Sequence, residues 1–124
     1  MYARDIYIEE YDWKVKAFFH AEKGDEEEVH EALEWAGAPD WVHERLSLDL
    51  DTGLTYSNKE DGKSVVVVCA GTCHCEEEDT ISHEKYHLTR HISSSCHIDP
   101  DDEQAAYLSG TIGKLLACGC DSCK

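Results

Sequence analysis

The sequence predicts a single α+β domain, with a small mixed or antiparallel sheet, one helix crossing it, and two C-terminal helices that carry a metal site. Three observations lead to this fold class. Residues 1–70 contain the alternating runs that are typical of strands, together with one amphipathic stretch. Residues 71–117 hold two further helical patterns, and residues 118–124 form a cysteine-rich tail. A chain of 124 residues also has the length of one domain with one modest core.

The sheet is expected to consist of two hairpins. The first joins residues 6–8 to residues 13–19, where apolar and polar positions alternate. The second joins residues 54–57 to residues 64–69 across a polar segment that ends in glycine. The consecutive valines in the last of these runs are typical of a strand buried on both faces, near the middle of a sheet. Residues 41–50 fit both a short helix and an alternating strand.

Three helices are expected where apolar residues recur every three or four positions. The first crosses the sheet between Asp25, which can cap it, and Gly37, which ends it. The second follows a polar linker at residues 73–79. The third is expected to begin at Asp99 as the cap, with Pro100 at the first helical position.

Composition narrows the classes of function. The formal net charge of −16 argues against direct nucleic-acid binding, because contacts with phosphates need a basic surface. A solvated acidic surface is the simplest interpretation, since acidic residues are spread through the chain. The sequence has no apolar run of membrane-spanning length and no signal-peptide pattern, so a cytoplasmic protein without membrane contact is expected. Its seven cysteines, an odd number, form a poor disulfide framework and fit reduced thiols.

The stretch Ile81–His87 carries the strongest indication of function, because it contains the pattern His83-Glu84-x-x-His87. On a helix, residues i and i+4 lie about 40° apart, so the two histidines can bind one metal ion. Glu84 lies about 100° from His83 and can stay outside the inner shell, where it can accept a proton from a metal-bound water. Two nitrogen ligands, an open position and a nearby carboxylate are typical of a hydrolytic zinc site.

A catalytic zinc site needs a third protein ligand, and the segment Glu103-Gln104-Ala105-Ala106 offers one in the last helix. The order of strand, HExxH helix, short loop and a helix with Glu-x-x-Ala resembles the gluzincin branch of zinc metallopeptidases. Within that branch it is most similar to the small HExxH peptidases encoded by phages and mobile elements. The resemblance covers residues 65–116 and implies a minimal zincin-like domain that cleaves a protein or peptide substrate in the cytoplasm. It also implies the zinc ligands His83, His87 and Glu103, and the general base Glu84.

Other residues compete for the position of third ligand. His91, four residues after His87, is the main alternative, although adjacent turns of one helix hardly bring three imidazoles equally close to one ion. Three carboxylates near the start of the last helix are the remaining alternatives: Asp99, Asp101 and Asp102. Tyr107 and His97 are candidates for stabilising the transition state only because they lie near the motif in sequence.

The cysteines form two groups that can hold a second, structural metal. Cys73-x-Cys75 precedes the HExxH helix, and Cys118-x-Cys120-x-x-Cys123 closes the chain. Four thiolates from these groups can bind one zinc ion and fix the C-terminus beside the start of that helix. The first alternative to a structural zinc site is that these cysteines are free thiols. The second is an iron–sulfur cluster, which the spacing of the cysteines fits less well.

Two alternatives to a hydrolase remain open from the sequence. One is a non-catalytic zinc-binding domain of the same fold, acting as a protein-interaction module. The other is an acidic interaction protein that mimics nucleic acid, in which the HExxH pattern occurs by chance, as short motifs in histidine- and glutamate-rich chains do.

Overall fold

The structure is a computed structural model that describes residues 1–47, 52–71, 73–99 and 101–117. Its elements, in chain order, are β1 (Tyr2–Ile8), a 3-10 turn η1 (Glu9–Tyr11), β2 (Trp13–Ala21), α1 (Glu26–Trp35), α2 (Asp40–Arg45), β3 (Gly53–Asn58), β4 (Lys63–Cys69), α3 (His74–Ser95) and α4 (Glu103–Leu115). The strands form one mixed sheet, which confirms the predicted mixture of helices with a small sheet. No helix within the described ranges is long and apolar enough to cross a membrane.

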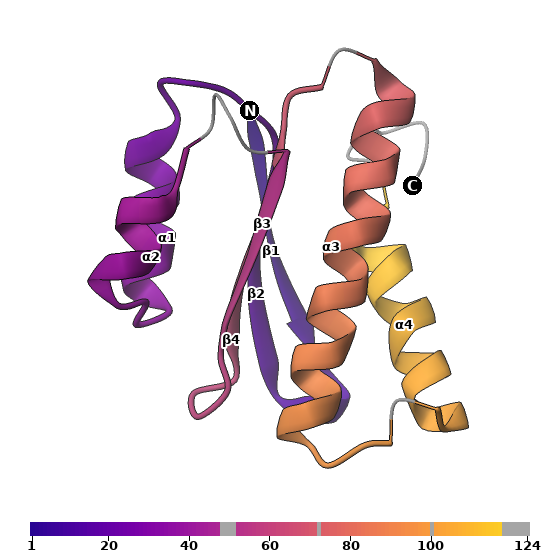
Figure 1. Ribbon diagram of the computed structural model, residues 1–124. Helices are drawn as coiled ribbons and strands as arrows, with labels where there is room; N and C mark the ends of the chain where they lie inside the picture. The colour runs from indigo at the N-terminus through magenta and orange to yellow at the C-terminus, as the bar shows by residue number, and fades with distance from the viewer. Residues whose placement is uncertain (48–51, 72, 100, 118–124) are drawn as a thin grey trace.

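The molecule has three layers, with α1 and α2 on one side of the sheet and α3 and α4 on the other (Figure 1). The strand order is β1-β2-β4-β3. Both predicted hairpins are confirmed, because β1 pairs antiparallel with β2 and β3 pairs antiparallel with β4. The two hairpins meet through a parallel pairing of β2 with β4. Parallel neighbours need a long crossover connection, and α1, α2 and β3 provide it.

The valine run of β4 is the centre of the fold, as predicted. Val65 and Val67 pack toward α1 and α2, whereas Val66 and Val68 pack toward α3 and α4. All four are at most 2% exposed. This alternation follows from the period of two in a strand, and it divides the interior into two apolar cores, one on each face of the sheet.

The HExxH helix is longer than predicted. The linker expected at residues 73–79 is helical from His74 onward, and only Cys73 precedes it as the N-cap residue. Glu76 and Glu77 lie in the first turn, where negative charge interacts favourably with the helix dipole. At its other end, α3 continues to Ser95, and Ser93 in its last turn is buried at 2% exposure. The polar residues 75–79 are exposed or partly exposed and form the solvent-facing first turns of the helix, whereas the polar Ser93 faces the interior.

Two predicted helix caps differ in detail. The start of α4 is capped by Asp102, whose carboxylate accepts a hydrogen bond of 2.7 Å from the Glu103 amide, and not by Asp99. Asp25 does occupy the N-cap position of α1, but its carboxylate accepts from the Glu22 amide, 2.8 Å away, and not from the helix. Pro100, the predicted first helical residue, lies outside the described residues.

The stretch at residues 41–50 resolves into a short helix, α2, as far as the structure describes it. Positions 48–50 lie outside the described residues. Val42 is the buried residue of α2 and joins the core on the side of α1, while Trp41 remains 57% exposed. Val42 anchors α2 in this core, and the His43 ring stacks on His30 of α1, with the two Nδ1 atoms 2.8 Å apart.

Candidate metal centre

The helix α3 lies along β3, the edge strand of the sheet, and polar side chains join the two elements. The hydroxyl of Thr55 donates to Glu84 Oε1 at 2.8 Å. Two residues further along the strand, Ser57 Oγ lies 2.6 Å from His91 Nδ1. Residues 55 and 57 point to the same face of the strand, and residues 84 and 91 lie close together on the helical wheel. One polar stripe of α3 therefore faces β3.

His83, Glu84 and His87 form a group whose ligand atoms all lie within 4.8 Å of one another. The Nε2 atoms of the two histidines are 3.2 Å apart, and their rings stand nearly perpendicular, at 77°. Two nitrogens bound at 2.0–2.1 Å to one tetrahedral zinc ion are about 3.3 Å apart. The separation of the two Nε2 atoms is that of a hydrogen bond between the rings, and it is also close to the separation of two nitrogen ligands on one zinc ion.

Glu84 is the buried member of this group, at 3% exposure. A buried carboxylate costs free energy unless it is hydrogen-bonded, and the Thr55 hydroxyl supplies a donor. The strand also makes room for it: a Cβ at Gly53 would lie 2.7 Å from Glu84 Oε2 and 2.8 Å from Thr80 Cγ2. Thr55 and Gly53 are therefore part of the site. In the sequence, Gly53 indicates only a turn before a strand, and nothing there predicts that Gly53 or Thr55 contacts α3.

Gly53→Ala is expected to destabilise the protein by about 1–3 kcal/mol, because the added methyl group overlaps the Glu84 carboxylate and must displace it. Urea unfolding of the metal-free protein measures this effect. Gly110→Ala is the matched control, since a Cβ there meets nothing within 4 Å on α4 and should stabilise by about 0.5–1 kcal/mol. Equal stability of the two variants would show that Glu84 does not occupy the space beside Gly53.

His91 is engaged in a hydrogen-bond chain that enters the sheet. The Trp13 indole N–H donates to Ser64 Oγ at 2.8 Å, and Ser64 Oγ lies 2.7 Å from Ser57 Oγ, which contacts His91. An indole nitrogen can only donate. When each hydroxyl donates onward, His91 Nδ1 is the final acceptor and the ring proton lies on Nε2. His91 does not join the group formed by His83, Glu84 and His87.

The pKa of His91 is lowered from its ordinary value by burial, and further by the positive charges of Lys59 and His87. Protonation of His91 therefore opposes folding. The resulting stability is fully present above about pH 6.5, the ordinary histidine pKa, and is lost as the pH falls below it. We expect the melting temperature in EDTA to fall more between pH 7.5 and pH 5.5 in the wild type than in His91→Gln, which keeps an acceptor but does not titrate. Equal losses in both proteins would contradict this expectation.

Glu103 does not lie with the two histidines. It is the exposed first residue of α4 and is absent from the group of ligand atoms. The helix α4 packs on the side of α3 where Lys85 and Thr89 line a pocket together with the first turn of α4. The helix α4 runs back along α3 from its C-terminal end (Figure 1), and a Cβ at Gly113 would lie 3.5 Å from the Lys85 side chain. Glu103 stands ten residues before Gly113, about 15 Å along α4 at 1.5 Å per residue, so it lies beyond the metal group toward the C-terminal end of α3. The other carboxylates considered as ligands are also absent from the group: Asp99, Asp101 and Asp102.

Two of the five cysteines that were predicted to hold a second metal lie at the start of α3. Cys73 and Cys75 are exposed, and their sulfur atoms are 3.5 Å apart. A hydrogen bond from the Glu76 amide, and then one involving Cys75, lowers the pKa of the Cys73 thiol, which favours the thiolate that binds metals. The end of α4 points toward this half of α3 (Figure 1). The three remaining predicted ligands lie outside the described residues: Cys118, Cys120 and Cys123.

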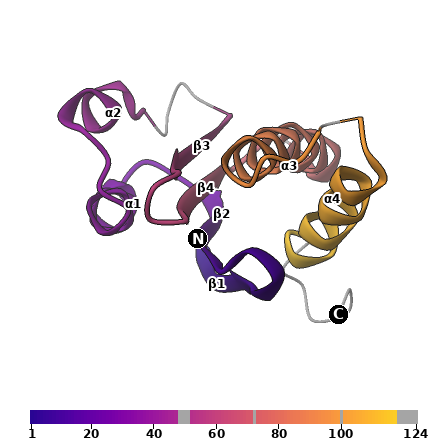
Figure 2. The same ribbon diagram turned by 90° about the horizontal axis from the view of Figure 1, so that it is seen from below.

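A pocket of about 520 Å³ opens beside His87. Figure 2 shows β3 between α2 and α3, and the pocket crosses this strand from one helix to the other. Its walls are Trp41, Val42 and Arg45 of α2, the first residues of β3, and His87. The Arg45 guanidinium forms no hydrogen bond or ion pair with any residue of the described ranges. The candidate metal group therefore adjoins a cavity with an exposed indole and an available cation.

Comparison with known proteins does not place the chain in a family. No protein-family model, no curated protein and no solved structure matches it.

Proposed function

We propose that the protein is a zinc-dependent hydrolase that cleaves peptides lying along β3. His83 and His87 hold the metal, and Glu84 acts as the general base. The observation that carries this proposal is the 3.2 Å spacing of the two Nε2 atoms beside a buried carboxylate. When bound, zinc supplies a Lewis acid that polarises the substrate carbonyl and lowers the pKa of water.

The chain's own contribution to the chemistry centres on Glu84. Its Oε1 is held by the Thr55 hydroxyl, which fixes the orientation of the carboxylate, and Oε2 lies over Gly53. A general base must be positioned before it can act, and Thr55 is the positioning residue here. Glu84 takes the proton of the attacking water and then gives it to the leaving amine.

The surroundings of the metal group support an extended peptide as the substrate. Among the strands that the structure describes, β3 pairs with β4 alone, so its other edge offers backbone groups that can pair with an added strand. The pocket beside His87 lies on the same edge and can take one substrate side chain. Trp41 provides apolar contact area there and Arg45 provides a cation, so this pocket favours an aromatic or acidic side chain.

The proposal assigns two protein nitrogens to the zinc ion. Glu103 lies at the start of α4, outside the group of ligand atoms, and His91 Nδ1 is engaged by Ser57, so neither is used as a ligand. The remaining coordination positions of a bound ion would be open to water and substrate. A site with two protein ligands binds zinc less tightly than the usual site with three, so zinc has to be present in the assay buffer.

A cleavage assay on mixed unstructured peptides tests the proposal. We expect zinc-loaded protein to produce new termini, detected by mass spectrometry, enriched for aromatic or acidic residues next to the cut. Cleavage should stop in EDTA and return when zinc is restored. Activity that persists at the same rate in EDTA, or no cleavage of any peptide by zinc-loaded protein, would contradict the proposal.

A further inference from the structure

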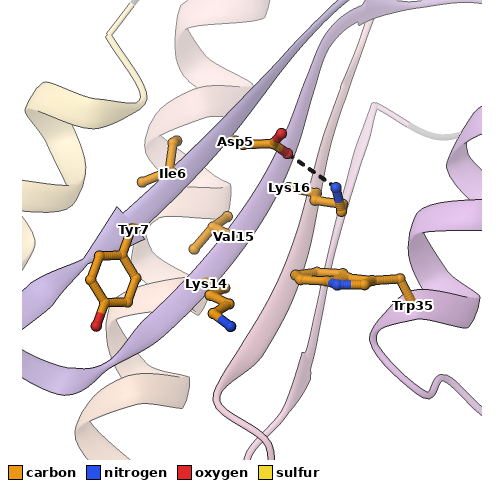
Figure 3. Close-up of a pocket in the computed structure, with 7 residues that line it drawn as sticks. All are labelled: Asp5, Ile6, Tyr7, Lys14, Val15, Lys16 and Trp35. Atoms are coloured by element: carbon orange, nitrogen blue, oxygen red, sulfur yellow. Dashed lines mark hydrogen bonds and ion pairs between the residues drawn. The ribbon is translucent and has the colours of Figure 1, made fainter.

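Part of the sheet face that carries α1 and α2 is left open. Among the described residues, the core beneath these helices draws on β2, β3 and β4 but on no residue of β1. A pocket of about 310 Å³ lies over β1 and β2 beside this core. Figure 3 shows Tyr7 and Trp35 at its two sides, with Lys14 between them. This arrangement places a lysine between two aromatic rings.

Three lysines gather at this open face: Lys14, Lys16 and Lys63. Lys14 and Lys63 are direct partners across the β2–β4 pairing, and Lys16 shares the face of Lys14. The chain has only 11 lysines and arginines against 27 acidic residues, so a cluster of three lysines is unusual for so acidic a chain. Like charges directly opposite one another in a sheet cost free energy. A bound anion would relieve that cost.

Two of these lysines already have partners. The Nζ atoms of Lys16 and Lys63 lie 5.0 Å and 5.1 Å from the centre of the Trp35 ring, within the range of cation–π contacts. Lys16 also pairs with Asp5 at 3.2 Å, as Figure 3 shows. The Lys14 ammonium, by contrast, forms no hydrogen bond or ion pair with the part of the chain that the structure describes. Lys14 is the cation that remains available to a ligand.

Both aromatic walls are held in place although they are open to solvent. Tyr7 is 53% exposed, and its hydroxyl donates to Asp12 Oδ1 at 2.7 Å. Trp35 is half-buried and is fixed by its two lysine contacts. Rigid aromatic side chains on two sides of a small cavity suit a flat ring, and a volume near 300 Å³ is at the lower end for small-molecule pockets.

We propose that this pocket binds a small aromatic anion, with its ring between Tyr7 and Trp35 and its carboxylate or phosphate on Lys14. The site uses no residue of the metal group. Its Lys14 and Lys16 share the β2 face of Phe18, which belongs to the core beneath α1 and α2, whereas α3 covers the other face of the sheet (Figure 1). Its ligand can therefore be tested in metal-free protein, and the outcome does not depend on the proposed hydrolase.

An NMR titration tests the site directly. Indole-3-acetate and indoxyl phosphate represent the two anionic groups, indole-3-acetamide is the neutral analogue, and inorganic phosphate lacks the ring. We expect one or both aromatic anions to shift the indole N–H signal of Trp35, with Trp13 as the internal reference. The better anion should bind at least about tenfold more tightly than the amide, because the amide oxygen can still accept from Lys14 but carries no negative charge to pair with the ammonium.

Variants of Lys14 and Tyr7 test which residue contacts the anionic group of the ligand and which contacts its ring. Lys14→Gln should weaken binding of the aromatic anion about tenfold, whereas Lys114→Gln, the same change on α4, should leave it unaltered. Tyr7→Ala should weaken it as well, and this exposed position tolerates the change. The proposal is overturned if neither aromatic anion shifts Trp35, if acid and amide bind equally, or if the two lysine variants behave alike. Inorganic phosphate binding as tightly as indoxyl phosphate would overturn the role of the rings.

Discussion

Glu84→Gln is expected to lower kcat for peptide cleavage by about 10²–10⁴-fold while the protein keeps its zinc. The amide has the same shape as the carboxylate and can still accept the Thr55 hydrogen bond, but it cannot take a proton from water. KM should change little, because Glu84 is buried and lies outside the substrate pocket as described. Steady-state kinetics, with metal content measured on the same samples, give both quantities.

The matched control for this variant is Asp79→Asn, which removes one negative charge from an exposed position of the same helix. It should retain the activity of the wild type. Full activity of Glu84→Gln would end the interpretation as a water-activating hydrolase. If instead the wild type binds zinc through the histidine pair and cleaves no peptide, the chain is better described as a zinc-binding module without catalysis.

The parts of the fold that could be predicted are those set by local periodicity. Val65 to Val68 are buried on both faces because a strand alternates its side chains, and four β-branched residues in succession leave no polar face. The start of α3 could not be predicted in the same way. Its first turns are polar and exposed, so hydrophobic periodicity is absent there, and the helix is favoured by acidic residues near its N-terminus.

In the metal centre, too, some contacts follow from local sequence and others depend on how the helices pack. His83 and His87 come together because i and i+4 are neighbours on any helix, so their pairing follows from the sequence alone. The contacts of Glu84 with Thr55 and Gly53 depend on how α3 rotates over β3, which no local pattern defines. The position of Glu103 depends likewise on which side of α3 receives α4. The apolar residues of α4 pack into the core beside Leu88, and this contact carries Glu103 away from the histidines.

The second large effect is expected on the affinity of the protein for zinc. His87→Ala should weaken zinc binding by more than about 100-fold, beyond the 10–100-fold cost of removing an outer-shell partner, because it removes one of two nitrogen ligands. Glu103→Ala should bind zinc as the wild type does, since Glu103 is exposed and lies outside the group of ligand atoms. Competition with a chromophoric chelator at pH 7.5 measures each dissociation constant, and His91→Gln serves as the control for a histidine on the same helix. If Glu103→Ala loses zinc as His87→Ala does, α4 must rotate to bring its first residue to the metal, and the predicted ligand set of two histidines and Glu103 would be restored.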